Sequence, residues 1–329
     1  MLRALTAELG DEDELIVVDN ASTDGTPDAV REAAPDATVA EEGKNLGFAA
    51  ASNRGAAVSS GDLLLFLNPD AVVAPGFRDA IELPLTEDRG WAAWQGLVTS
   101  AGGRVVNSRG GAVHFTGIAW AGGAGEPLTA DEPEPAEPGF ASGACLAVPS
   151  RAFDDAGGFA EPFFLYHEDV DLSLRLRLAG GRLGVERRAR VDHDYEFAKG
   201  PEKWRQLERN RWATVIRTYP GALLALLAPA LLATEFALVP ISLAGGWAGK
   251  KLLSWIDIAR WLPRLLRERR QIQAGRQVPA REFARALTPD LESSYLGAAG
   301  RSRLLRAALR AYWSAVLALV GGSRSAIAD

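Results

Sequence analysis

Leu63-Leu64-Leu65-Phe66-Leu67-Asn68-Pro69-Asp70 joins five apolar residues to a polar turn. The apolar run predicts a buried strand, and Asn-Pro-Asp predicts the turn that ends it. Shorter runs of the same kind precede it at 15–19 and 38–40, and the stretches 27–34 and 45–55 between them are typical of helices. Strands and helices that alternate at this spacing predict an α/β fold, with a parallel sheet covered by helices on both faces.

Acidic residues follow two of these predicted strands. Asp19 ends the first one, and Asp70 closes the turn after the third. In a parallel sheet the ligand lies at the carboxyl ends of the strands, so we expect these two carboxylates to share one site. Taken by itself, the turn Asn68-Pro69-Asp70 is more typical of an ordinary turn than of a binding site.

A second acidic cluster lies in the aromatic stretch 163–172. Glu168, Asp169 and Asp171 follow Phe163-Phe164-Leu165-Tyr166-His167. Because acidic residues favour the first turn of a helix, we expect a helix to start near Glu168, with Glu168 and Asp169 at the mouth of a pocket. A carboxylate backed by aromatic rings suits a general base with a shifted pKa. The alternative is a solvated acidic helix start.

The remaining part of this half is less regular. The Gly-rich stretch 90–125 predicts irregular strands, and 130–138 predicts an exposed loop. A strand is expected over 140–148, where Gly143 allows close approach of a ligand or forms a bulge. The last predicted strand, 184–193, ends on His193. His114 and His167 are assigned structural roles.

Composition limits the class of protein. With 47% hydrophobic residues, the 329-residue chain can bury a large core. Its net charge of -6 argues against a nucleic-acid partner. Basic residues gather after position 200, which favours an anionic partner there, such as a membrane surface. The single Cys145 excludes an intramolecular disulfide and a CxxC metal site.

Five short motifs occur in a fixed order over roughly residues 12–215. They are Val17-Val18-Asp19-Asn20-x-Ser22-x-Asp24-Gly25-Thr26, Asn45-x-Gly47-Phe48, Asn68-x-Asp70, Gly157-Gly158-Phe159 and Tyr166-x-Glu168-Asp169-x-Asp171-Leu172. With these motifs the chain resembles the family 2 glycosyltransferases, and most closely their rhamnosyltransferase-like branch. The resemblance implies a GT-A fold, which is a Rossmann-like, mostly parallel sheet flanked by helices.

The resemblance also implies a reaction. A sugar leaves a nucleotide-diphosphate donor with inversion, and Mg²⁺ or Mn²⁺ neutralises the diphosphate leaving group. It implies that Asp169 is the catalytic base, with Glu168 beside it, and that Asp70 and His193 contribute to the metal site. Asp19 is expected to contact the base or ribose of the donor. The other donor-side residues are Asn20, Ser22, Asn45, Gly47 and Asn68. The acceptor-side residues are Gly143, Tyr166 and Asp171.

The chain departs from the family pattern at two places. The family's first strand, of the type Val-Val-Ile-Val-Thr-Tyr-Asn, is not seen before the helix expected at 1–10. We expect either a longer native protein or an impaired one, because losing a central strand leaves backbone groups unpaired. Asn68 also replaces the first Asp of the metal motif, which leaves metal binding to Asp70, His193 and the donor phosphates.

We expect a catalytic domain at 1–200 and a helical, membrane-associated region at 201–329. Residues 221–247 are apolar except for Glu235 and exceed the roughly 20 residues that cross a bilayer. A second candidate is 304–320. Because both flanks of 221–247 are basic, we favour an in-plane or re-entrant hairpin, broken at Pro229 and Pro240, over one full span. A soluble helical domain is the alternative.

Two arginines that precede this region are candidates for the donor site. Arg209 and Arg211 carry guanidinium groups, which suit the leaving diphosphate. A basic helix on a membrane surface, or a simply solvated one, explains the same residues equally well.

The sequence therefore predicts an inverting, metal-dependent, bacterial glycosyltransferase at the inner face of the cytoplasmic membrane. It would transfer a sugar, with rhamnose as the candidate, to a lipid-linked or cell-surface glycan acceptor. The alternatives are a non-catalytic, membrane-associated homologue and a sugar nucleotidyltransferase. The latter is disfavoured because no Gly-rich phosphate loop with Lys or Arg is seen near the start.

Overall fold

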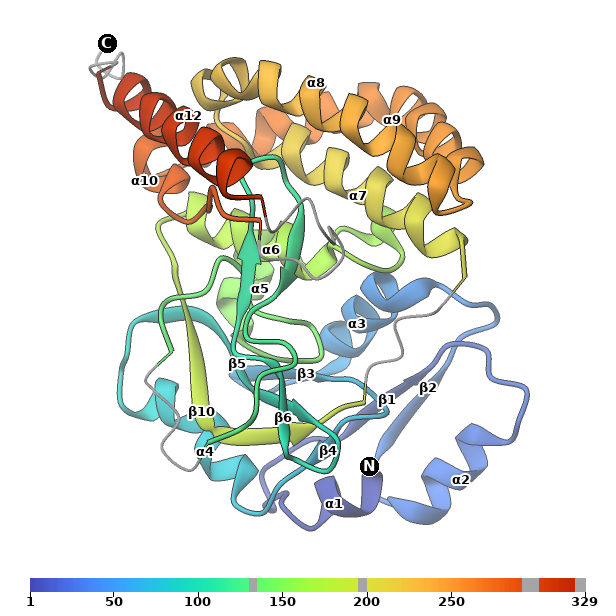
Figure 1. The fold of residues 1–329 in the computed structure, drawn as a ribbon. Helices are drawn as coiled ribbons and strands as arrows, with labels where there is room; N and C mark the ends of the chain where they lie inside the picture. Colours follow the sequence, from blue (N-terminus) through green and yellow to red (C-terminus); the bar gives the residue numbers. More distant parts are fainter. Residues whose placement is uncertain (130–134, 195–199, 292–301, 323–329) are drawn as a thin grey trace. The chain divides into compact units, whose positions relative to one another are not determined.

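The computed structural model describes residues 1–129, 135–194, 200–291 and 302–322. The chain divides into two compact units (Figure 1). The first comprises Met1–Gly111, Ala121–Leu176 and Gly181–Phe197, and the second comprises Ala112–Trp120, Arg177–Gly180 and Ala198–Asp329. Part of the predicted loop at 130–138 lies outside the described residues.

The first 67 residues form the elements expected from their local pattern. The helices are α1 (Leu2–Thr6), α2 (Thr26–Ala33) and α3 (Gly47–Val58), and the strands are β1 (Ile16–Asp19), β2 (Thr38–Glu41) and β3 (Leu63–Leu67). β1 pairs in parallel with β2, as predicted. The three strands do not share one sheet, however, because β3 belongs to a separate, six-stranded one.

That larger sheet is mixed, so the expectation of a mostly parallel sheet is wrong. Its order is β3-β9-β5-β10-β4, with β6 added on β5. The strands are β4 (Val72–Val73), β5 (Trp91–Ser100), β6 (Val105–Ser108), β9 (Cys145–Pro149) and β10 (Arg182–Asp192). β9 runs antiparallel to both β3 and β5, whereas β10 runs parallel to β5. After β5 the chain re-enters the sheet on the side where β5 ends. β9 therefore runs in the direction opposite to that of β5.

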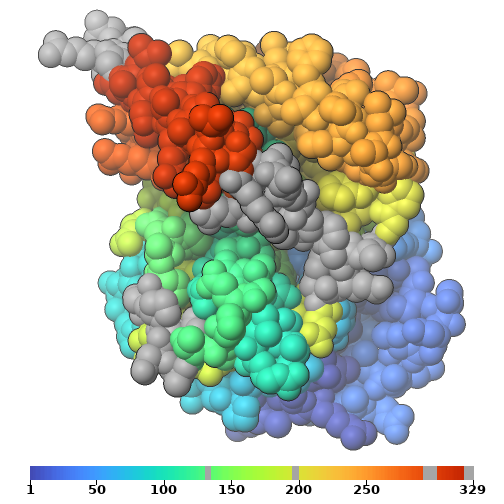
Figure 2. Space-filling model, in the orientation of Figure 1, coloured from blue at the N-terminus to red at the C-terminus, as the bar shows by residue number. Residues whose placement is uncertain are grey.

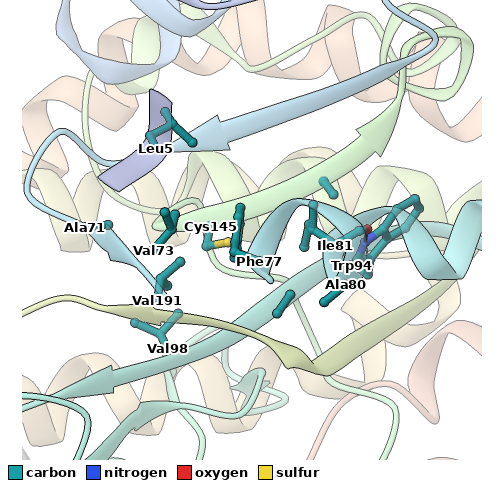
Figure 3. Close-up of a cluster of buried hydrophobic side chains, with 12 residues drawn as sticks. Leu5, Ala71, Val73, Phe77, Ala80, Ile81, Trp94, Val98, Cys145 and Val191 are labelled. Carbon is teal, nitrogen blue, oxygen red and sulfur yellow. Dashed lines mark hydrogen bonds between the residues drawn. The ribbon is translucent and has the colours of Figure 1, made fainter. Parts of the chain in front are cut away.

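Apolar side chains cover both faces of this sheet. On β9, Cys145 and Ala147 belong to one buried cluster, and Leu146 and Val148 belong to the other. This alternation follows from the two-residue period of a strand. The first cluster packs beneath α4 (Phe77–Thr86) and includes Trp94 (Figure 3). The second includes residues of α5 (Ser150–Ala156) and of α6 (Glu168–Leu178).

The second unit is largely helical. Its elements are α7 (Glu202–Thr218), α8 (Gly221–Ala244), α9 (Ala248–Ala274), α10 (Ala280–Ala284) and α12 (Arg303–Gly322). The short strands β7 (Gly111–Val113) and β8 (Ala119–Ala121) pair with each other in a two-stranded sheet. Phe115 stacks on Trp313 of α12 with a ring-centroid distance of 5.1 Å. This stacking holds the last described helix to the hairpin.

The helix α8 corrects the expectation of a hairpin over 221–247. It continues without a break through Pro229 and Pro240, both of which are exposed. A proline ring on the outer side of a helix removes one hydrogen bond without displacing a packed neighbour. Within the described residues, Gly221–Ala244 and Arg303–Gly321 are long and apolar enough to cross a membrane, with mean hydropathies of 2.1 and 1.3. Length and composition alone do not show that either helix does so.

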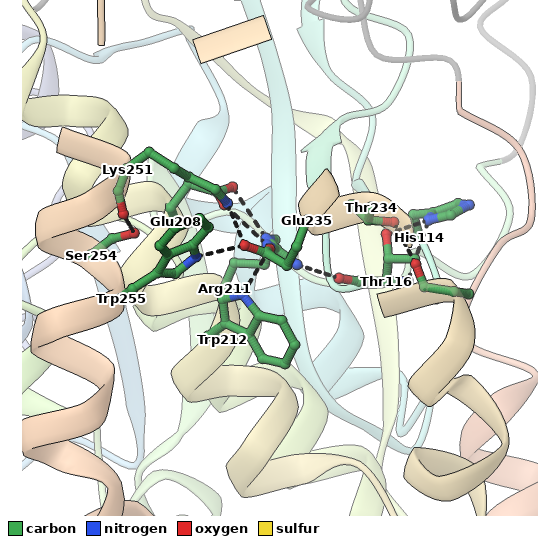
Figure 4. A network of polar contacts seen from close by, with 11 residues as sticks. His114, Thr116, Glu208, Arg211, Trp212, Thr234, Glu235, Lys251, Ser254 and Trp255 are labelled. Atoms are coloured by element: carbon green, nitrogen blue, oxygen red, sulfur yellow. Dashed lines mark hydrogen bonds and ion pairs between the residues drawn. The ribbon is translucent and has the colours of Figure 1, made fainter. Parts of the chain in front are cut away.

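Glu235, the one charge in α8, joins a buried cluster of four charges (Figure 4). Arg211 of α7 contacts both Glu208 and Glu235, and Lys251 of α9 contacts the same two carboxylates. Arg211 also donates to the carbonyl of Thr116 at 3.0 Å. We call these four side chains the charge cluster. Its two positive and two negative charges neutralise one another, which is what allows them to be buried.

Candidate functional site

One edge of the six-stranded sheet collects the two predicted metal-binding residues and Gly143, which was predicted on the acceptor side. β3, β5 and β10 run in the same direction, and β9 runs against them. Asp70 follows the end of β3, His193 follows the end of β10, and Gly143 precedes the start of β9. Asp70 and His193 therefore lie at the carboxyl ends of strands that run in the same direction, where a ligand is expected. Asp19 ends β1 of the separate two-stranded sheet, and a site shared by Asp19 and Asp70 stays a prediction.

Asp70 and His193 are in direct contact at this edge. The Oδ1 atom of Asp70 lies 3.0 Å from Nε2 of His193. The His193 backbone is fixed on both sides, because its N–H donates to Thr99 and its carbonyl accepts from the Asn107 side chain. The Asn68 amide nitrogen lies 3.4 Å from the same imidazole nitrogen. The carboxylate and the imidazole are thus close enough for both to coordinate one cation.

The turn 141–144 connects this pair to the predicted base. The Asn68 N–H donates to the carbonyl of Ala144 at 3.1 Å. The N–H of the adjacent residue, Gly143, donates to Oδ2 of Asp169 at 3.0 Å. Gly143 lies before β9 rather than within it, so the bulge interpretation is wrong. A side chain at this position would press against the Phe48 ring at 3.3 Å.

The segment that precedes α6 carries unusual backbone strain. Phe164, Tyr166 and His167 all have positive φ angles, of 66°, 72° and 67°. Such angles are costly for residues with bulky side chains, and they gather at functional sites. Gly47 permits this conformation, since a Cβ atom there would lie 2.5 Å from the Phe164 carbonyl oxygen and ring. No local pattern in the sequence signals this strain.

Two acidic side chains begin α6, as predicted, and burial raises the pKa of both. The pKa of Glu168 is well above its ordinary value because of burial and the adjacent Asp169 charge. Burial also raises the pKa of Asp169, although the N–H groups of Gly143 and Val170 oppose the shift. Glu168 is 5% exposed, and its Oε2 atom has no hydrogen-bond partner. Burial therefore favours the protonated form of both side chains, and the adjacent Asp169 charge adds to this effect on Glu168.

Asp171, predicted on the acceptor side, is completely buried instead. Its carboxylate accepts from Arg175 at 2.7 Å, and Arg175 also donates to the carbonyls of Ala156 and Gly158. A carboxylate without exposed surface cannot meet an acceptor. Asp171 therefore fixes the Gly157-Gly158 turn to α6.

Most of the predicted donor-side residues lie at the end of β1 and in the segments that follow β1 and β2. Asp19 is buried and accepts from the N–H of Ser22 at 3.0 Å. Asn20 accepts from Leu46 at 2.6 Å, and Asn45 accepts from Gly47 at 2.9 Å. Of these bonds, the one from the Leu46 N–H to Asn20 joins the two loops, and Gly47 lies against Phe164. The nucleotide contacts themselves stay a prediction.

Arg209 and Arg211 lie on α7 of the second unit. The Arg209 guanidinium lies over the Trp261 ring at 4.5 Å, and Arg211 belongs to the charge cluster. To clamp a diphosphate, Arg211 would have to abandon two carboxylates and a carbonyl. Its assignment to the donor site is therefore weakened, and that of Arg209 stays a prediction.

Within the described ranges, no group of three or more His, Cys, Asp or Glu side chains that could hold a metal is found. Among the described residues Asp70 and His193 are a pair, so a cation there would need ligands in addition to these two. A divalent ion that also binds phosphate oxygens meets that condition.

Comparison with known proteins agrees with this geometry. The model of the family described as "Glycosyl transferase family 2" matches residues 1–90. The N-acetylglucosaminyl-diphospho-decaprenol L-rhamnosyltransferase of Mycobacterium tuberculosis is 31% identical over 226 residues, which cover 61% of this chain and 73% of that protein.

Solved structures support the fold. GalNAc-T7, determined with UDP, GalNAc and Mn²⁺, matches with a TM-score of 0.51 at 15% identity, over 66% of this chain and 44% of that one. S. aureus TarS matches with a TM-score of 0.51 at 16% identity, over 97% of this chain and 51% of that one. Identities this low show a common fold and no more. Together with the mycobacterial relative, they establish that this chain is a GT-A protein and belongs to glycosyltransferase family 2.

Proposed function

We propose that the protein transfers a sugar, with inversion, from a nucleotide-diphosphate donor to a lipid-linked or cell-surface glycan acceptor. Rhamnose is the candidate sugar, because the mycobacterial relative is named a rhamnosyltransferase that acts on a decaprenol-linked acceptor. The proposed location is the inner face of the cytoplasmic membrane. The observation that carries the proposal is the run of contacts from Asp169 through Gly143, Ala144 and Asn68 to His193 and Asp70.

In this proposal the chemical step is a single displacement. Asp169 accepts the proton of the acceptor hydroxyl as that oxygen bonds to the anomeric carbon. The bond between that carbon and the diphosphate oxygen breaks, and its electron pair leaves with the nucleoside diphosphate. Attack opposite the leaving group inverts the anomeric centre. Glu168, protonated beside Asp169, keeps the local negative charge to one.

Asp70 and His193 fit a divalent cation. The Asp70 side chain is 61% exposed, so it is accessible to a cation, and the His193 imidazole is only 3.0 Å away. Because Mg²⁺ prefers oxygen ligands, the imidazole makes Mn²⁺ the better match. Such a cation would neutralise the charge that develops on the diphosphate.

The cation assignment predicts a change in metal dependence. Asp70→Asn and His193→Gln should each raise the Mn²⁺ concentration for half-maximal turnover at least tenfold, since even outer-shell losses cost ~10–100-fold. Calorimetric titration of Mn²⁺ into the UDP-bound protein should likewise show a higher Kd for Mn²⁺ in both variants than in the parent. Asp62→Asn, an exposed carboxylate before β3, is the matched control. Unchanged Mn²⁺ dependence in both site variants would exclude this pair as ligands.

The raised pKa of Asp169 predicts the pH dependence. The base works when ionised, so kcat/KM should fall as the pH drops through this raised pKa. The acid limb should therefore lie above the ordinary Asp value of about 3.9. Glu168→Gln should leave the limb in place, because Gln resembles the neutral Glu. A displacement of more than about one pH unit would show instead that the two carboxyls titrate as a pair.

The test of the function is transfer by the purified full chain. UDP-N-acetylglucosamine, GDP-mannose and dTDP-rhamnose would be offered with Mn²⁺ and a polyprenyl-diphosphate N-acetylglucosamine acceptor. Nucleoside diphosphate release and the lipid product would be measured. Binding of a donor without release or product would favour the non-catalytic homologue. The alternative of a sugar nucleotidyltransferase is not supported, because the chain belongs to a family of glycosyltransferases.

A further inference from the structure

The exposed side of α8 carries apolar residues only. Leu232, Phe236 and Leu243 are 59%, 77% and 66% exposed. The single acidic residue of this 24-residue helix, Glu235, is held inward by Arg211 and Lys251. The exposed surface of α8 is thus apolar along its whole length, which is uncommon for a helix that faces water.

The helix α9 extends this apolar surface. Exposed apolar side chains on it lie three, four or seven residues apart, so they form one stripe: Leu252, Trp255, Ile256, Leu262 and Leu266. The surfaces of α8 and α9 adjoin in the space-filling view (Figure 2). We call these exposed side chains of α8 and α9 the apolar face. Trp255 donates its N–H to Glu235 at 2.7 Å, and its ring is partly exposed on this face.

A basic row borders the apolar face. Arg260, Arg264 and Arg267 are exposed and lie four and three residues apart on α9, next to the stripe. Arg264 pairs with Glu268, and that carboxylate also pairs with Arg217. Apolar side chains beside a row of arginines are the pattern of a helix that lies in the headgroup region of an anionic membrane.

The charge cluster indicates how α8 meets such a membrane. Glu235 lies near the middle of α8, and its partners come from α7 and α9. If α8 crossed the bilayer, the midpoint of the crossing would carry these charges, or Glu235 would lose its partners. Either arrangement is expensive. Lying in the plane keeps the charge cluster inside the unit and turns only the apolar face to the lipid.

We propose that the second unit docks on an anionic lipid bilayer through the apolar face, with α8 and α9 lying in the membrane plane and the basic row on the lipid phosphates. This inference rests on the proposed location of the enzyme at a membrane and specifies how it is held there. The occupant is lipid, because a row of three arginines beside the apolar face complements an anionic surface.

The test is flotation of the full chain with vesicles of phosphatidylcholine alone or mixed with phosphatidylglycerol. The parent should float mainly with the mixed vesicles, and salt should reduce this binding. Arg260→Glu with Arg267→Glu should weaken binding about fivefold or more per arginine. Phe236→Glu with Leu243→Glu should abolish it. Arg151→Glu, an exposed arginine of α5, is the matched control and should float like the parent.

Three outcomes would overturn the proposal. Equal flotation with both vesicle types would show that the basic row does not contribute to membrane binding. Retention in the membrane after alkaline extraction would show a crossing helix. A stable dimer that Phe236→Glu dissociates would assign the apolar face to a second copy. Donor hydrolysis measured on the same samples separates this question from catalysis: loss of flotation with hydrolysis intact concerns docking alone, and flotation without hydrolysis concerns the proposed activity alone.

Discussion

Replacing Asp169 with Asn should lower the turnover number for sugar transfer by about 10²–10⁴-fold, the contribution of a positioned general base. Asn retains a side-chain oxygen that can accept the N–H of Gly143, so the turn 141–144 should keep its shape. The donor should therefore bind with an unchanged Kd. The loss should appear in kcat, because only the transfer of the acceptor proton is removed.

The matched variants for this experiment are Glu168→Gln and Asp154→Asn. Glu168→Gln keeps a neutral side chain at a buried position, so most of the turnover should remain. Asp154 is an exposed carboxylate on α5, and its loss should leave turnover unaltered. If Asp169→Asn turned over like the parent while Glu168→Gln did not, the base would be Glu168. Parent-like turnover in both would remove the base from α6 altogether.

Arg211→Met should cost about 3–5 kcal/mol of unfolding free energy, the largest stability effect expected in this protein. The substitution leaves the single positive charge of Lys251 against the two negative charges of Glu208 and Glu235 within the charge cluster, and the Thr116 carbonyl loses its donor. Urea unfolding followed by tryptophan fluorescence measures the loss. Arg151→Met is the control, because its pair with Asp155 is exposed and worth about 0–1 kcal/mol.

A double variant identifies the cause of this loss. Glu208→Leu combined with Arg211→Met removes one charge of each sign and leaves Glu235 paired with Lys251. The double variant should therefore be more stable than the Arg211→Met single variant. A double variant that loses the sum of both single effects would mean that packing, rather than uncompensated charge, determines the cost.

Local pattern was sufficient to predict many of the elements. β1, β2, β3, α2 and α3 lie where alternating apolar runs and capping residues placed them, and α6 begins at the predicted Glu168. Asp70 and His193 lie in contact, as the family resemblance led us to expect, and their role in metal binding stays a prediction. The elements were predictable from short-range preferences, whereas the choice of these two side chains depended on the resemblance.

Long-range pairing was not predictable in the same way. No feature of 145–149 shows that this strand runs against its neighbours, because that direction depends on where the chain re-enters the sheet. The positive φ angles of Phe164, Tyr166 and His167 also lack a local signal, since they are imposed by contacts such as that with Gly47. The Asp171–Arg175 pair, by contrast, was readable from its four-residue spacing.

The orientation of β9 has a consequence for how this enzyme can diversify. Because β9 enters at the edge where β3 and β10 finish, one four-residue turn touches both Asp169, the proposed base, and Asn68 at the end of β3, beside the proposed cation ligand Asp70. In the proposed mechanism the main chain of this turn would therefore fix the distance between the base and the cation site. Substitutions in the peripheral loops could then change which sugar or acceptor is bound without changing this distance.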